Sequence, residues 1–207
     1  DLMLDLLISG ATVVDGTGAP AATADVGVKD GRIVEVGRIT GATRERIDGA
    51  GAWLTPGFVD IHTHYDGQAS WDETFSPSIH HGVTTLMMGN CGVGFAPVRP
   101  DQHDFLIELL EGVEDIPGTA LSEGMTWGWE SFPEYLDLLD RLRWTVDVGT
   151  QVPHAALRTY VMGDRGADHA EVPSEREIEE MALLTEQALR AGAMGFTTSR
   201  TTKHKAK

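Results

Sequence analysis

The chain has 207 residues, enough to bury the core of one or two domains. Apolar residues make up 41% of it and charged residues 23%, a balance typical of globular rather than disordered proteins. The formal net charge of -16 would repel a phosphate backbone, which argues against nucleic acid as a partner. Because no apolar run approaches the ~20 residues of a membrane span, we expect no membrane partner either. The lone cysteine permits no internal disulfide and favours a reducing compartment, for which we expect the cytoplasm.

The first 55 residues have the pattern of a small all-β domain. Short β-rich runs occur at residues 6–8, 11–14, 24–28 and 32–36. The turn sequences between them include Asp15-Gly16 and Asp30-Gly31, and Asp-Gly between apolar runs is a hairpin signal. We therefore expect residues 1–55 to form a separate antiparallel β layer with no helix in residues 11–36.

From residue 56 onward, short apolar strands alternate with helical patterns. The strands are expected at residues 58–61, 83–88, 146–152 and 193–198. A helical turn is expected at residues 76–81, and helices are expected at residues 101–112, 131–143 and 174–191. Ser131 with Glu134, and Ser174 with Glu177, form capping-box patterns at the starts of the last two helices.

Strand–helix alternation favours parallel βα units, and the loops after the strands are rich in His, Cys, Gly and Ser. Four such units amount to half of a (β/α)8 barrel, which needs eight units and ~250 residues. The fold class we predict is therefore α/β, with residues 56–207 as the first half of a barrel. On this count the chain is expected to be a piece of a larger protein.

Two neighbouring strand ends carry residues that can bind a metal ion. His62 and His64 close the first strand, and residues i and i+2 of a strand point to the same side. Cys91 is expected at the end of the second strand, where it is flanked by Gly89, Gly92 and Gly94. Since adjacent strands lie about 5 Å apart, the thiolate and the two imidazoles can share an ion. The alternatives are two polar residues at a strand end and a small buried thiol.

These residues fall in segments that resemble a known family. Residues 54–66 read LTPGFVDIHTHYD, similar to the first barrel strand of the amidohydrolase superfamily. Residues 82–94 read GVTTLMMGNCGVG and resemble the D-aminoacylases, or N-acyl-D-amino-acid deacylases, whose second strand supplies a cysteine ligand. Residues 111–118 and 127–136 are similar to the same group, and residues 1–55 match its small flanking β-sandwich.

The resemblance implies a zinc hydrolase with one or two Zn²⁺ ions, acting on a small-molecule N-acyl amino acid. The metal would activate water and polarise the amide carbonyl, with His62, His64 and Cys91 as ligands; thiolate and imidazole together favour zinc. In this family, further histidine ligands and an aspartate general acid/base come from later strands, which correspond to positions beyond residue 207. We therefore expect residues 1–207 alone to be inactive, and the rest of the barrel to be their partner.

Three other residues are weaker candidates. His154 follows the third strand and is expected either to line the substrate pocket or to be structural. Arg200 can meet a substrate carboxylate in a bidentate pair, although a surface arginine is the alternative. Asp66 is expected to orient an imidazole ligand, or else to be a loop carboxylate.

The sequence is also compatible with two other functions. One is a hydrolase of the dihydroorotase or hydantoinase type within the same superfamily. The cysteine speaks against it, because most members use a carbamylated lysine from a later strand. The other is a non-catalytic half-barrel.

Overall fold

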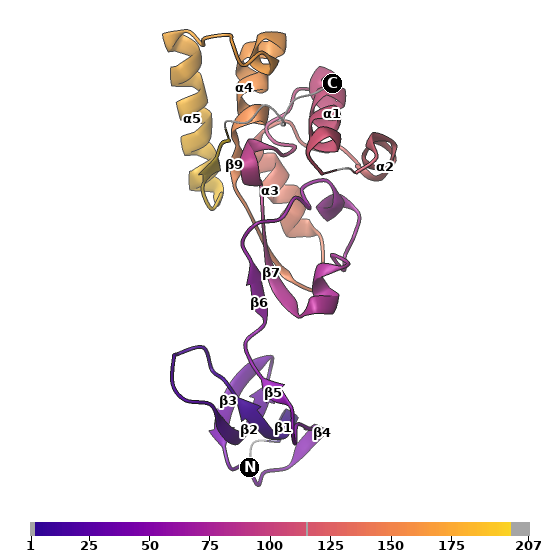
Figure 1. The fold of residues 1–207 in the computed structure, drawn as a ribbon, viewed down its shortest axis with the longest axis vertical. Helices are drawn as coiled ribbons and strands as arrows, with labels where there is room; N and C mark the ends of the chain where they lie inside the picture. The colour runs from indigo at the N-terminus through magenta and orange to yellow at the C-terminus, as the bar shows by residue number, and fades with distance from the viewer. Residues whose placement is uncertain (1–2, 115, 200–207) are drawn as a thin grey trace. The chain divides into compact units, whose positions relative to one another are not determined.

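The computed structural model describes residues 3–114 and 116–199 (Figure 1). The chain divides into two compact units, Asp1–Gly57 and Phe58–Lys207.

The first unit is a five-stranded sheet without a helix in its described residues. Its strands are β1 (Leu4–Val13), β2 (Ala22–Lys29), β3 (Arg32–Gly37), β4 (Thr43–Asp48) and β5 (Trp53–Leu54). The order is β3-β2-β1-β4, and β5 also pairs with β1. β2 is antiparallel to β1 and β3, whereas β4 and β5 run parallel to β1. The sheet is thus mixed, and the expectation of a purely antiparallel layer is wrong, because the chain crosses over after β3 and returns on the far side of β1.

The predicted hairpin at Asp30-Gly31 is confirmed. Both residues have positive φ values, 50° and 72°, and Lys29 pairs with Arg32 across the turn. Two central residues with positive φ are the requirement of a type I′ turn, whose twist matches that of the strands it joins. An Asp-Gly pair satisfies that requirement at little cost.

The second unit contains a parallel sheet of three strands, β6 (Phe58–Asp60), β7 (Val83–Met88) and β8 (Asp147–Thr150), in that order. A second, short parallel pair joins β9 (Val152–Pro153) to β10 (Phe196–Thr197). The predicted third strand is therefore divided at Gln151 into β8 and β9, and the fourth is shorter than expected. The segment that leads into β10 is still hydrogen-bonded to the divided third strand. The Met194 N–H donates to the Thr150 carbonyl, and the Val152 N–H donates to the Gly195 carbonyl, at 2.9 Å each.

In the part of the chain that the structure describes, five α-helices accompany these strands: α1 (His103–Glu114), α2 (Gly118–Gly124), α3 (Phe132–Arg141), α4 (His154–Met162) and α5 (Glu175–Ala191). The 3₁₀ turns are η1 (Gln68–Ser70), η2 (Ser78–His81), η3 (Asn90–Gly92), η4 (Pro100–Gln102) and η5 (Gly163–Ala167). Both predicted capping boxes are present, at Ser131 and at Ser174. The sequence patterns miss α2 and α4, since each follows a proline and begins without a side-chain cap.

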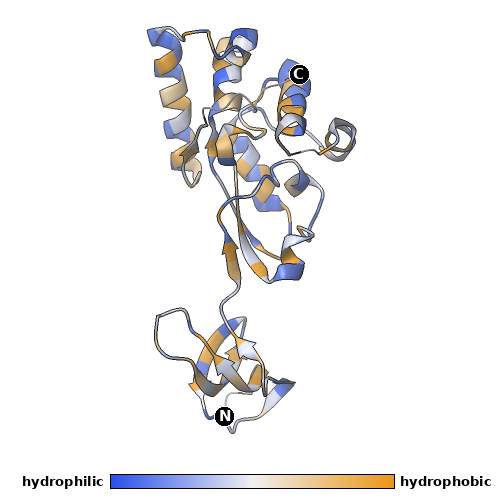
Figure 2. Cartoon of the chain, viewed as in Figure 1, coloured by the Kyte–Doolittle hydropathy of each residue, from blue (hydrophilic) through white to orange (hydrophobic). Residues whose placement is uncertain are grey.

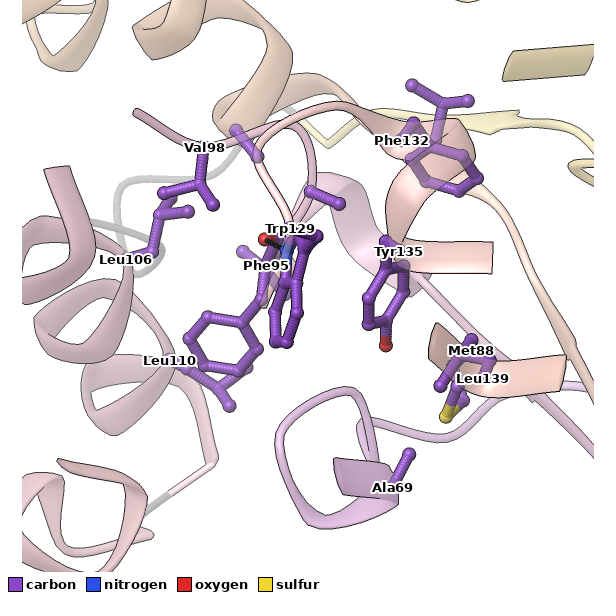
Figure 3. Close-up of a cluster of buried hydrophobic side chains, with 14 of the residues drawn as sticks. Ala69, Met88, Phe95, Val98, Leu106, Leu110, Trp129, Phe132, Tyr135 and Leu139 are labelled. Atoms are coloured by element: carbon purple, nitrogen blue, oxygen red, sulfur yellow. Dashed lines mark hydrogen bonds between the residues drawn. The ribbon is translucent and has the colours of Figure 1, made fainter. Parts of the chain in front are cut away.

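The core of the second unit lies between β7 and the helices α1 and α3. Phe132, Tyr135 and Leu139 occupy one face of α3 and are buried, as their spacing requires. Figure 3 shows the rings of Phe95, Trp129 and Tyr135 gathered there; the Trp129 indole donates a hydrogen bond of 2.7 Å to the Phe95 carbonyl. This packing anchors the loops that follow β6 and β7.

Apolar side chains are also exposed in this unit. β6 carries Phe58 and Val59 at 63% and 60% exposure, and α5 shows apolar positions along its length (Figure 2). Among the described residues, no helix has both the length and the apolar character needed to cross a bilayer.

Candidate metal centre

The two histidines lie just beyond the first strand of the second unit. β6 ends at Asp60, one residue earlier than predicted, because the Asp60 carboxylate accepts the His62 N–H at 3.2 Å. Thr63, between the histidines, is buried, and its N–H and hydroxyl both donate to the Met87 carbonyl, at 3.0 and 2.8 Å. With Thr63 turned toward β7, alternation along an extended chain sends His62 and His64 to the opposite side.

Cys91 lies in the turn after β7 and not on the strand itself. β7 ends at Met88, and Cys91 is the middle residue of η3. Its φ of 56° is in the left-handed region, which non-glycine residues seldom adopt. The neighbouring Gly89 and Gly92 also have positive φ values, so the chain doubles back and returns the cysteine toward β6.

The structure brings these three side chains together. His62 Nε2 lies 3.2 Å from Cys91 Sγ, and one ligand atom from each of His62, His64 and Cys91 lies within 4.8 Å of the other two. The two imidazole rings are 5.5 Å apart at an interplanar angle of 62°, so their edges converge instead of stacking.

This donor set fits a divalent metal ion. Zinc–nitrogen and zinc–sulfur bonds of about 2.0–2.3 Å place tetrahedral ligand atoms roughly 3.3–3.8 Å apart. The distance of 3.2 Å between His62 Nε2 and Cys91 Sγ is close to that range, and the ligand atoms of all three residues lie within 4.8 Å of one another. A soft thiolate beside two imidazoles matches zinc better than magnesium or calcium, which prefer oxygen ligands.

Asp66 is buried, and it contacts the turn that carries Cys91. Its Oδ1 accepts the Gly89 N–H at 2.8 Å, which fixes the start of the turn that carries Cys91. Its backbone carbonyl accepts the Tyr135 hydroxyl at 3.0 Å. Burial, and then the charge of Asp66, raise the pKa of Tyr135 well above its usual value, so this phenol stays protonated. Contact of the carboxylate with an imidazole stays a prediction.

His154, the next candidate, lies against the end of β10. His154 is the first residue of α4; its Nδ1 lies 2.9 Å from Thr198 Oγ1 and its ring 5.7 Å from that of Phe196. Burial is the main reason that the pKa of His154 is lowered, and Arg158 and His169 add to the effect. Arg200 lies outside the described residues.

Sequence patterns do not single out the residues that hold the Cys91 turn. Asn90 is buried, its amide donates to the carbonyls of Thr63 and Met87, and Gln151 donates to its oxygen. Thr63 and Gln151 lie 27 and 61 positions from Asn90 in the sequence, so no local spacing reveals these two partners. The only local signal is the glycine frame of Gly89-Asn90-Cys91-Gly92.

Comparison with known proteins defines the family. The sequence model described as "Amidohydrolase family" matches residues 45–207. The chain belongs to the amidohydrolase family. It is 34% identical over 195 residues to a D-aminoacylase of Alcaligenes xylosoxydans xylosoxydans, and 35% identical over 195 residues to an N-acyl-D-aspartate deacylase of the same organism. Each alignment covers 94% of this chain but only 37% and 36% of the relative, so the chain spans about a third of these amidohydrolases.

Solved structures agree with this placement. A D-aminoacylase crystal structure, described as defining a novel subset of amidohydrolases, matches with a TM-score of 0.77 at 36% identity, covering 94% of this chain and 38% of that one. An N-acyl-D-glutamate deacylase from Bordetella bronchiseptica, complexed with zinc and a phosphonate inhibitor, matches with a TM-score of 0.74 at 32% identity, covering 95% and 38%. The mixed α/β fold described above is therefore that of an amidohydrolase domain of the D-aminoacylase type.

Proposed function

We propose that the protein is a zinc-dependent amidohydrolase that cleaves N-acyl-D-amino acids into a carboxylic acid and a D-amino acid. The observation that carries this proposal is the convergence of His62, His64 and Cys91 within 4.8 Å. The similarity to D-aminoacylase and to two N-acyl-D-amino-acid deacylases supports the substrate class.

In this proposal the three side chains hold the metal centre, as one ion or two. A bound divalent ion supplies Lewis acidity toward the amide carbonyl and lowers the pKa of water to near neutrality. Cys91 binds as the thiolate and the imidazoles bind as neutral bases, so the cluster must release protons to accept the metal. The exposed edge of His62 leaves the centre open to solvent, as a hydrolytic site requires.

The architecture we propose for the whole protein is a (β/α)8 barrel flanked by a small β-sandwich. Residues 1–55 would contribute to the sandwich and residues 56–207 the first strands of the barrel. The exposed apolar side chains of β6 support this arrangement, since barrel strands are normally covered on both faces. His154 and Arg200 are proposed to contact the substrate, and an aspartate outside this chain to act as general acid/base.

The test is an activity assay of the full-length protein with matched N-acetyl-D- and N-acetyl-L-amino acids, alongside metal analysis. We expect zinc in the purified protein and turnover of the D-series. Cys91→Ala and His64→Ala should each reduce turnover by at least about a hundredfold and lower the bound zinc together with it. His80→Ala, on the turn η2, is the matched histidine control and should behave as the wild-type protein does.

Two outcomes would redirect the proposal. Activity on cyclic amides such as dihydroorotate or hydantoins, without activity on N-acyl amino acids, would favour a hydrolase of the dihydroorotase or hydantoinase type. A zinc-free protein that is equally active with and without Cys91 would refute the metal centre.

A further inference from the structure

The turn that carries Cys91 has a backbone conformation that its own residues do not secure. Gly89, Cys91 and Gly92 have φ values of 74°, 56° and 77°. Glycine enters this region readily, but a cysteine stays there only when surrounding groups hold it. The position of the Cys91 sulfur therefore depends on contacts from outside residues 89–92.

Thr197, in the short strand β10, makes the contacts that bracket Cys91. Its Oγ1 accepts a hydrogen bond from the Gly92 N–H at 3.0 Å and donates one to the Gly89 carbonyl. These two peptide groups lie on either side of Cys91. A single hydroxyl thus closes the turn at both ends, across more than a hundred positions of sequence.

The chain beyond Thr197 continues this contact. Ser199 Oγ donates to the Cys91 carbonyl at 2.8 Å. A Cβ atom added to Gly92 would lie 3.1 Å from the Thr198 Cα, which is tighter than an ordinary van der Waals contact with a backbone atom. The end of β10 therefore lies directly against the cysteine turn.

The same turn is joined to the two histidines by Asn90. The Asn90 amide donates to the Thr63 carbonyl at 3.1 Å and to the Met87 carbonyl at 2.9 Å. Thr63 stands between His62 and His64. Fixing the turn consequently fixes the distance between the cysteine and both imidazoles.

We propose that Thr197 is a positioning residue of the metal centre, and that its hydroxyl holds Cys91 in the left-handed conformation in which the sulfur faces His62. The inference rests on the proposed function, because it requires Cys91 to be a ligand. Thr197 touches neither metal nor substrate in this role. It acts by preorganising the turn, as outer contacts do at other metal sites.

The experiment compares Thr197→Val, Thr197→Ala and Thr197→Ser in the full-length protein. Thr85→Val, a half-buried threonine of β7, is the matched control. Each metal-free protein is titrated with Co(II) and followed by thiolate-to-cobalt absorption, and hydrogen exchange of residues 89–94 is measured without metal. We expect Thr197→Val and Thr197→Ala to weaken Co(II) binding roughly 10- to 100-fold and to speed the exchange. Thr197→Ser keeps the hydroxyl and should retain wild-type behaviour.

A folded Thr197→Val or Thr197→Ala protein with wild-type cobalt affinity and slow exchange at residues 89–94 would overturn the inference. So would a Thr197→Ser protein as impaired as Thr197→Val, since the hydroxyl would then not be the cause. Absence of thiolate-to-cobalt absorption in the wild-type protein would instead refute the metal centre itself. That result is distinct, because it does not depend on any change at Thr197.

Discussion

His62 Nε2 and Cys91 Sγ lie 3.2 Å apart although 29 positions separate the two residues in the sequence. The contact forms because β6 and β7 are adjacent parallel strands, so the segments that leave them emerge at the same edge of the sheet. The two side chains therefore lie close enough to serve as ligands of one metal ion, Cys91 as the thiolate and His62 as the neutral imidazole.

The first prediction concerns the cysteine as a ligand. Cys91→Ser should abolish thiolate-to-cobalt absorption and weaken metal binding by more than the roughly 10- to 100-fold typical of lost outer contacts. The reason is that a hydroxyl is a poor replacement for a soft, ionised sulfur. Equilibrium dialysis with Zn²⁺ checks the affinity. Unchanged zinc affinity in the Cys91→Ser protein would contradict the ligand assignment.

The second prediction concerns the glycine that opens the cysteine turn. A Cβ at Gly89 would lie 2.1 Å from the Gln151 carbonyl oxygen, a backbone atom that cannot move aside. Gly89→Ala should therefore destabilise the second unit by about 3 kcal/mol or more, since overpacking adds to the cost of positive φ.

Gly82→Ala is the matched control for Gly89→Ala. Gly82 has a similar φ of 79°, but its added Cβ would meet only the Phe58 ring at an ordinary 3.5 Å. Gly82→Ala should lower the free energy of unfolding by only about 1–2 kcal/mol, because only the positive φ is unfavourable there. Urea unfolding followed by tryptophan fluorescence measures the stability of both variants, because the second unit contains Trp71, Trp127, Trp129 and Trp144. If both variants lost the same free energy of unfolding, the clash at Gly89 would be relieved by movement of its neighbours, and the prediction would be wrong.

The third prediction concerns the titration of His154. Burial lowers its pKa below the ordinary 6.5, and Arg158 and His169 act in the same direction. Between the folded pKa and 6.5 the unfolded chain binds more protons than the folded one, so this histidine makes stability fall as the pH drops through that window. Above pH 6.5 it has no such effect. NMR titration of the imidazole checks the shift.

His154→Asn provides the comparison for the stability effect. It should flatten the pH dependence below 6.5 while leaving the free energy of unfolding near pH 8 less affected. His80→Asn, on the exposed turn η2, is the control for the effect of the substitution itself. A His154 resonance that titrates at or above 6.5 would contradict the prediction.

Much of this fold could be predicted from the sequence because its signals are local. The Asp30-Gly31 hairpin and the capping boxes at Ser131 and Ser174 each depend on residues within four positions of one another. Strand placement at Phe58 and Val83 follows from short apolar runs, which periodicity detects directly. The helix α4 has no such signal, since it begins after Pro153 without a capping side chain.

The site could be predicted only in its outline. Both histidines and the cysteine follow strands that parallel topology places side by side, so their approach to one another is a consequence of the strand order. The left-handed turn at Cys91 and the contacts of Thr197 are not local. They arise where β10 meets the turn after β7, and no pattern within either segment encodes that meeting.

The final prediction is that residues 1–207, produced alone, hydrolyse no N-acyl amino acid above background. Three candidate metal ligands are within the chain, but in the proposed function further ligands and the general acid/base come from residues outside it. Loss of a general acid/base typically costs a factor of ~10² to 10⁴, and an incomplete set of ligands loosens the metal as well. Zinc binding by this chain would be compatible with the prediction, because His62, His64 and Cys91 are all present.

The assay tests residues 1–207 with N-acetyl-D- and N-acetyl-L-amino acids, and the Cys91→Ala chain serves as the blank. Steady turnover by residues 1–207 that disappears in the Cys91→Ala chain would show that the catalytic groups lie within these residues.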